Sequence, residues 1–262
     1  MLLTIDVGNT QTVLGLFDAD RIVEHWRLAT DPRRSADELG LLLTGLLNSA
    51  ESLGGSGIDG AVDGIACCST VPSALREMRA MCERWFGAVP LVVVEPGIRT
   101  GVPVLYDNPK EVGADRIVNT LAAHTLHGGP AIVVDFGTST NFDVVSATGE
   151  FLGGVLAPGI EISVDALASR AAQLMKVQLV RPRSVIGKNT VESLQSGIIY
   201  GFAAQVDGIT ERIVAELGTP AIVIATGGLA PVVLEECRLI DVHEPWLTLI
   251  GLRLVFERNA AS

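Results

Sequence analysis

Short apolar runs separated by turn residues open the chain and return in its second half. The first series predicts three strands joined by tight turns, over Leu2–Val7, Thr12–Asp18 and Ile22–Leu28. The second series predicts three more, over Ala131–Asp135, Asn141–Ser146 and Gly149–Leu156. Each series is typical of an antiparallel meander, and its return indicates two related halves.

Helical periodicity follows each meander. Leucines at helical spacing after Ser35-Ala36-Asp37-Glu38 predict one helix, because Ser and Glu three residues apart form a capping box. Further helices are predicted over Pro72–Trp85 and roughly Thr190–Leu217. Asn108-Pro109 predicts the start of another, which runs to about Leu126. Strands that alternate with such helices predict an α/β fold.

Two glycine turns carry the candidate chemistry. The first is Asp6-Val7-Gly8-Asn9-Thr10 and the second is Asp135-Phe136-Gly137-Thr138-Ser139, and each follows an apolar strand. A single copy has an alternative interpretation, an Asx-type turn whose carboxylate satisfies only backbone donors. Two copies after similar strands favour ligation of a cation and phosphate, since a carboxylate there is costly to bury without partners. Two such turns facing each other would clamp a nucleotide.

Composition narrows the function class. The 262 residues are 48% hydrophobic and 19% charged, which is typical of a compact globular chain, and this length is enough for two modest domains. The net charge of −11 disfavours nucleic acid as a partner. The four cysteines lack C-x-x-C spacing, and His124 and His127 have no third ligand nearby in sequence. Buried thiols and packing histidines are therefore the default interpretation.

Two uncharged stretches raise the question of a membrane span. Glycine and proline interrupt both of them, at Gly128-Gly129-Pro130 in one and at Pro220 and Gly227-Gly228 in the other. Neither stretch is typical of a transmembrane helix. No basic region or cleavage site opens the chain, so the sequence predicts a cytoplasmic protein without membrane partners.

The usual nucleotide fingerprints are missing from the sequence. No G-x-G-x-x-G follows a strand, and Gly187-Lys188-Asn189-Thr190 has Pro182 where a P-loop needs its first glycine. Phosphate binding then depends on the two glycine turns. Thr226-Gly227-Gly228 adds a strand-to-helix turn where a ligand can approach bare backbone.

The order of motifs resembles the type III pantothenate kinases of the actin-like ATPase superfamily. Besides the two turns, the resemblance is carried by Tyr106-Asp107-Asn108-Pro109, Gly113-Ala114-Asp115-Arg116, Gly153-Gly154 with Pro158-Gly159, Gly187-Lys188-Asn189-Thr190 and His243-Glu244-Pro245-Trp246. It implies two duplicated ribonuclease H-like domains, residues 1–120 and 121–262, with a nucleotide cleft between them near residues 118–130.

The resemblance also implies roles for the residues of both turns. The ATP phosphates would be cradled by Asp6, Val7, Gly8, Asn9, Thr10, Gln11, Thr12 and Val13. Asp6 would also lie near the Mg²⁺ shell, and Thr138 would contact the nucleotide from the second turn. Asp135 would ligate a monovalent cation, K⁺ or NH₄⁺, which offsets the charge of the triphosphate.

Further residues would form the pantothenate pocket. The family pattern places Gly113, Ala114, Asp115 and Arg116 there, with Asp115 as the general base. By the same resemblance Tyr106 would line this pocket, and Thr190 would reach in from the partner subunit of a homodimer. Each has a plainer alternative: an Asp-Arg pair solvated on a helix, a tyrosine covering apolar surface and a threonine capping a helix.

The function implied is ATP-dependent phosphorylation of pantothenate to 4′-phosphopantothenate, the first step of coenzyme A biosynthesis. Two alternatives stay open at this point. One is a nucleotide-binding regulatory protein of the same fold without kinase turnover. The other is a related phosphotransferase or phosphohydrolase, which would release ADP with another acceptor or with none.

Overall fold

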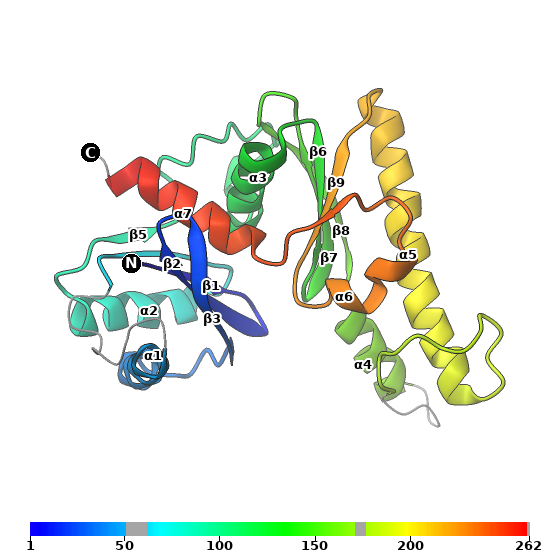
Figure 1. Cartoon of the computed structure of the whole chain (residues 1–262), viewed down its shortest axis with the longest axis horizontal. Coiled ribbons are helices and arrows are strands. Elements are labelled where there is room, and N and C mark those ends of the chain that lie inside the picture. Colours follow the sequence, from blue (N-terminus) through cyan, green and yellow to red (C-terminus); the bar gives the residue numbers. More distant parts are fainter. Residues whose placement is uncertain (51–61, 171–176, 261–262) are drawn as a thin grey trace. The chain divides into compact units, whose positions relative to one another are not determined.

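The computed structural model describes residues 1–50, 62–170 and 177–260 (Figure 1). The described chain forms two compact units. Unit 1 contains the described parts of Met1–Gly101, Asn108–Ala122 and the last helix from Thr248, whereas unit 2 contains Val102–Asp107 and the described parts of Ala123–Leu247. The division follows contacts, so it does not correspond to a single cut in the sequence.

Unit 1 is built on a five-stranded sheet in the order β3-β2-β1-β4-β5. Its strands are β1 (Leu2–Val7), β2 (Gln11–Asp18), β3 (Arg21–Ala29), β4 (Gly64–Ser69) and β5 (Leu91–Val93). The central strand β1 pairs antiparallel with β2 on one side and parallel with β4 on the other. The predicted meander is confirmed.

Unit 2 repeats this sheet with the order β10-β9-β6-β7-β8. Its strands are β6 (Ala131–Phe136), β7 (Ser139–Val145), β8 (Phe151–Pro158), β9 (Ile222–Thr226) and β10 (Val242–His243). Here β6 pairs antiparallel with β7 and parallel with β9, as β1 does with β2 and β4. The α/β class and the internal duplication predicted from the sequence are therefore confirmed.

Both central strands bury every residue except one. In β1 and in β6 the first four residues and the sixth are buried, and the fifth, Asp6 or Asp135, is partly exposed. Each buried Leu, Ile or Val stabilises the fold by roughly 1.5–3 kcal/mol relative to an exposed position. The two apolar strands thus fix where each carboxylate lies, at the C-terminal end of the strand.

Helices cover both faces of the sheet of unit 1. One face carries α1 (Ala36–Ser49) and α2 (Pro72–Trp85), which share an apolar core with Leu3, Ile5 and Cys67. The predicted capping box is present, since the Ser35 side chain accepts from the Glu38 backbone and the Glu38 side chain accepts from the Ser35 backbone. The start of α1 and both ends of α2 lie where the sequence predicts them.

The opposite face carries α7 (Leu247–Ala260) and the first part of α3 (Ala114–His127). A Cβ on Gly251 would lie 2.2 Å from the Val118 carbonyl oxygen, so the two helices cross at backbone contact. Thr248 Oγ1 donates to Asn119 Oδ1 at 2.8 Å beside this crossing. The N-terminal half of α3 is thereby anchored on the sheet of unit 1.

The predicted helix from Asn108 is wrong at its start. Pro109–Glu111 forms only a 3-10 turn, and α3 begins at Ala114. The physical reason is a break at Val112, whose φ of −77° and ψ of 123° are extended and not helical. The break puts Asp115 in the first turn of α3.

The helices of unit 2 are α4 (Ile160–Arg170), α5 (Thr190–Leu217) and the short α6 (Ala230–Val233). The long helix α5 spans the predicted residues. Its N-cap is Asn189, whose side chain accepts from the Glu192 N–H at 2.9 Å, so the alternative of Thr190 as the capping residue is wrong. Among the described residues, no helix is long and apolar enough to cross a membrane.

Candidate active site

In the turn between β1 and β2, four residues, Gly8 to Gln11, lie between the last paired residues of the two strands. Val7 pairs with Thr12, and the Gly8 N–H donates to the Gln11 carbonyl at 3.0 Å to close the loop. A Cβ on Gly8 would lie 3.0 Å from the same carbonyl oxygen, which explains the glycine. Asn9 and Thr10 are exposed at the tip. The loop therefore presents amide and hydroxyl donors of the kind that bind phosphate.

Asp6 lies at the base of this loop beside a buried thiol. In the parallel pair of β1 and β4, Asp6 is opposite Cys68, and the Cys68 thiol donates to Asp6 Oδ1 at 3.3 Å. Burial, and then the negative charges of Asp6 and Asp115, raise the pKa of the Cys68 thiol well above its usual value. The thiol is therefore protonated at neutral pH. Because both carboxylates act on it, all three side chains gather at one place in unit 1.

Asp115 is held ready to accept a hydrogen bond. Desolvation raises the pKa of its carboxyl group, while the Arg116 N–H, the Arg116 charge and its own N–H oppose the rise. Its Oδ1 atom is buried and has no hydrogen-bond partner within the described parts of the chain. Arg116 is only 7% exposed, so the alternative of a solvated surface pair is wrong. A buried carboxylate with one unused acceptor suits a general base.

The second turn repeats the first with one residue fewer. Phe136 pairs with Thr140, and the Gly137 N–H donates to the Ser139 carbonyl at 3.0 Å. Asp135 lies opposite Asn141 on one side and Thr226 on the other, as Asp6 lies opposite Val13 and Cys68. Thr138 is exposed at the tip. The carboxylates of the two units thus occupy equivalent positions.

Two glycines allow other backbone segments to approach Asp135 and its turn closely. A Cβ on Gly227, whose φ is +90°, would lie 2.5 Å from Asp135 Oδ1. A Cβ on Gly159 would lie 2.2 Å from the Thr138 carbonyl oxygen and 2.7 Å from that of Gly137. No group of three or more His, Cys, Asp or Glu residues that could hold a metal ion occurs among the described residues. One carboxylate with backbone oxygens is a donor set that fits a monovalent cation.

Tyr106 and Thr190 both lie in unit 2, whereas Asp6 and Asp115 lie in unit 1. The segment that contains Tyr106 lies beside β8, since the Leu105 N–H donates to the Phe151 carbonyl at 2.8 Å. The Tyr106 ring packs at 6.0 Å from the Phe151 ring centre, yet the residue remains 37% exposed. The Tyr106 ring thus covers apolar surface, which is the plainer alternative given above, and part of the ring remains exposed. Thr190 is the exposed first residue of α5.

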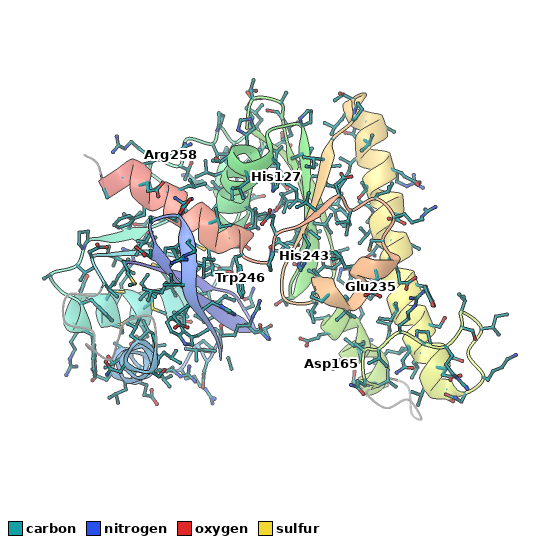
Figure 2. All side chains as sticks on the ribbon, viewed as in Figure 1. His127, Asp165, Glu235, His243, Trp246 and Arg258 are labelled. Carbon is teal, nitrogen blue, oxygen red and sulfur yellow. The ribbon has the colours of Figure 1, made fainter. Side chains whose placement is uncertain are left out.

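The histidines singled out in the sequence form ordinary contacts. His127 Nε2 lies 3.1 Å from Glu244 Oε1, next to the strand that carries His243 (Figure 2). His124 Nε2 lies 3.3 Å from the Ala147 carbonyl oxygen. Sequence reasoning missed Cys68, which it treated as a packing thiol. Only the register of β4 against β1 reveals its contact with Asp6, and that register is not visible along the chain.

Known proteins with similar sequences cover the whole chain. The family model for type III pantothenate kinase matches residues 2–212. A type III pantothenate kinase from Acidothermus cellulolyticus is 74% identical over 259 residues, which cover 99% of each chain. One from Streptomyces avermitilis is 67% identical over 262 residues, covering 99% of this chain and 98% of that one.

Solved structures with low sequence identity share the fold. A Campylobacter jejuni protein described as a Baf family transcriptional activator matches with a TM-score of 0.62 and 16% identity, covering 99% of this chain and 100% of that one. A ROK hexokinase from Thermus thermophilus matches with a TM-score of 0.53 and 16% identity, covering 100% and 99%. These matches show that the fold occurs in proteins with different names, including a sugar kinase.

The buried Asp115 carboxylate predicts a stability change on neutralisation. Because its folded-state pKa is raised, the ionised group lowers the free energy of unfolding at neutral pH. Asp115→Asn is therefore expected to be as stable as the wild type or more stable at pH 7 in urea unfolding. The gain shrinks as the pH falls through the raised pKa and vanishes below the ordinary value of about 3.9.

Asp18→Asn is the matched control, since Asp18 is an exposed carboxylate of the same unit at the end of β2. This control is expected to leave the free energy of unfolding within about 0.5 kcal/mol at every pH. A clear loss of stability in Asp115→Asn at pH 7 would contradict the assignment of a desolvated carboxylate.

Proposed function

The chain belongs to the type III pantothenate kinase family, and from this premise we propose how it phosphorylates pantothenate with ATP. The first turn holds the triphosphate, Asp115 acts as the general base, and Asp135 serves a monovalent cation. The observation that carries the proposal is the buried, unpartnered Oδ1 atom of Asp115. It lies in the same unit as the Asp6 turn, and both carboxylates act on one thiol.

Proton transfer follows from the environment of Asp115. As the primary hydroxyl of pantothenate attacks the γ-phosphorus, Oδ1 accepts its proton, a new O–P bond forms, and the bond to the β-phosphate oxygen breaks to release ADP. A base whose pKa is raised above the ordinary Asp value holds the proton more readily, while the nearby Arg116 charge opposes that rise. The rest of the rate enhancement comes from positioning.

Donors on the chain balance the charge of the triphosphate. The overall net charge of −11 repels ATP, so local donors in the first turn must outweigh it. Mg²⁺ bound with the ATP phosphates would neutralise charge on the transferred group, and Asp6 fits it, because Mg²⁺ is typically held by one or two carboxylates with substrate phosphates. Asp135, a carboxylate beside the backbone of the second turn, fits K⁺ or NH₄⁺.

Exposed apolar side chains support a homodimer. The outward face of the edge strand β8 carries Leu152 and Leu156, and Leu156 is 63% exposed. The loop before α5 adds Val185 and Ile186, of which Ile186 is 72% exposed. Exposed apolar side chains that adjoin one another, as Val185 and Ile186 do in the sequence, are a feature of protein interfaces. Thr190 follows directly, so a partner seated there would lie beside it.

Mixed dimers test whether the pocket is shared. Asp115→Asn removes the base from the pocket of its own subunit. Thr190→Trp blocks the pocket of the partner subunit, because Thr190 reaches into that pocket. Each variant alone is expected to be inactive. When the two are coexpressed, every hybrid dimer contains one site with Asp115 and Thr190 intact, so about a quarter of wild-type activity returns if chains assort at random. No recovery in purified hybrid dimers would contradict a shared pocket.

The direct test measures ADP release with Mg·ATP, with and without pantothenate, in K⁺ and in Na⁺ buffer. Release is expected to require pantothenate and to be faster in K⁺. Asp115→Asn is expected to lower kcat by about 10²- to 10⁴-fold while it retains ATP binding, because it removes general-base catalysis alone. Asp18→Asn serves as the control with unchanged turnover.

The other outcomes separate the alternatives. Unchanged turnover in Asp115→Asn would remove this residue from the role of base. ADP release without pantothenate would indicate a phosphohydrolase. ATP binding without turnover under all conditions would favour a regulatory protein of the same fold.

A further inference from the structure

Two adjacent cysteines on β4 have opposite surroundings. Cys67 and Cys68 are both completely buried. Cys67 belongs to the apolar core that α1 and α2 share with the sheet. Successive side chains of a strand point to opposite faces, so Cys68 belongs to the face that carries α7 and the start of α3. The same residue type therefore occurs once in a packing position and once beside charged groups.

Cys68 is a hydrogen-bond donor to Asp6. The register of β1 and β4 places the two residues opposite each other, and Cys68 Sγ lies 3.3 Å from Asp6 Oδ1. This distance is compatible with a hydrogen bond donated by a thiol, since sulfur is larger than oxygen. Asp115 is close enough to act on the same thiol. The sulfur atom therefore lies where the base of the phosphate turn and the general base come together.

The duplicated half has a donor at the same place. In unit 2 the residue opposite the turn carboxylate on the parallel strand is Thr226, opposite Asp135. Thr226 is 2% exposed, and its neighbours on β9 are apolar. A buried side chain with a proton to donate, Cys in one unit and Thr in the other, thus stands beside each carboxylate. An apolar residue would fill this buried position without a donor.

We propose that Cys68 is a positioning residue for phosphoryl transfer, whose thiol proton holds the Asp6 carboxylate in the orientation that receives Mg·ATP. This inference rests on the proposed function of the first turn. A carboxylate at the end of an apolar strand needs donors to stay ionised in one orientation. Without the thiol, Asp6 loses the contact that Cys68 makes with its Oδ1 atom.

The test compares three variants in the full-length protein. Cys68→Ala removes the donor, Cys68→Ser keeps a donor of similar shape, and Cys67→Ala removes the adjacent buried thiol from the core. Affinity for Mg²⁺ with a non-hydrolysable ATP analogue is measured by calorimetry, and KM and kcat are measured for ATP and pantothenate. Thermal unfolding checks that each variant is folded.

Cys68→Ala is expected to weaken analogue binding and raise KM for ATP by about three- to tenfold, as loss of one weak donor to a carboxylate implies. Cys68→Ser is expected to restore affinity to within about twofold, and Cys67→Ala to bind like the wild type. Equal losses in Cys68→Ala and Cys67→Ala, or no rescue by serine, would overturn the proposal. Because the calorimetry contains no pantothenate, it tests the role of Cys68 even if pantothenate is not the phosphoryl acceptor.

Discussion

A carboxylate at the end of an apolar strand is the arrangement on which the rest of this structure depends. Burying such a group is unfavourable unless donors or cations compensate the charge. Each half of the chain contains it once, as Asp6 near the end of β1 and as Asp135 near the end of β6, next to a glycine turn. Asp115 adds a third carboxylate, at the start of a helix anchored on the first sheet. The proposed function assigns the compensation of these charges to a phosphate-bearing ligand and its cations.

Glycine creates the space that these carboxylates need. Gly113 leaves room for the free oxygen of Asp115, and Gly227 does the same for Asp135. A methyl group at either position would occupy the place of the carboxylate oxygen or force it to move. The same residues explain local structure, since α3 begins only after Gly113, and β9 ends in a turn at Gly227 with positive φ. At both places the same glycine thus lies at the end of an element and next to a carboxylate oxygen.

Local signals in the sequence predict the elements with strong caps and long periodicity. The capping box at Ser35, the bounds of α2 and α5, and the duplicated meander are all readable because they depend on neighbouring residues. The repeated Asp-x-Gly pattern after apolar strands predicts the two turns, whereas the role of Asp115 came from the family resemblance. The contact of Cys68 with Asp6 joins residues 62 positions apart, and it depends on parallel strand register. The anchoring of α3 by α7 is likewise a contact between distant segments, through Gly251. Such non-local contacts leave no pattern along the chain.

The measurement that tests the central claim most directly is the pH dependence of kcat/KM for pantothenate at saturating Mg·ATP. The account predicts that kcat/KM falls about tenfold per pH unit on the acid side, with an apparent pKa above the ordinary Asp value of about 3.9. The residual activity of Asp115→Asn is expected to lack this acid limb. A wild-type profile that stays flat down to about pH 4, or an acid limb that persists unchanged in Asp115→Asn, would contradict the account.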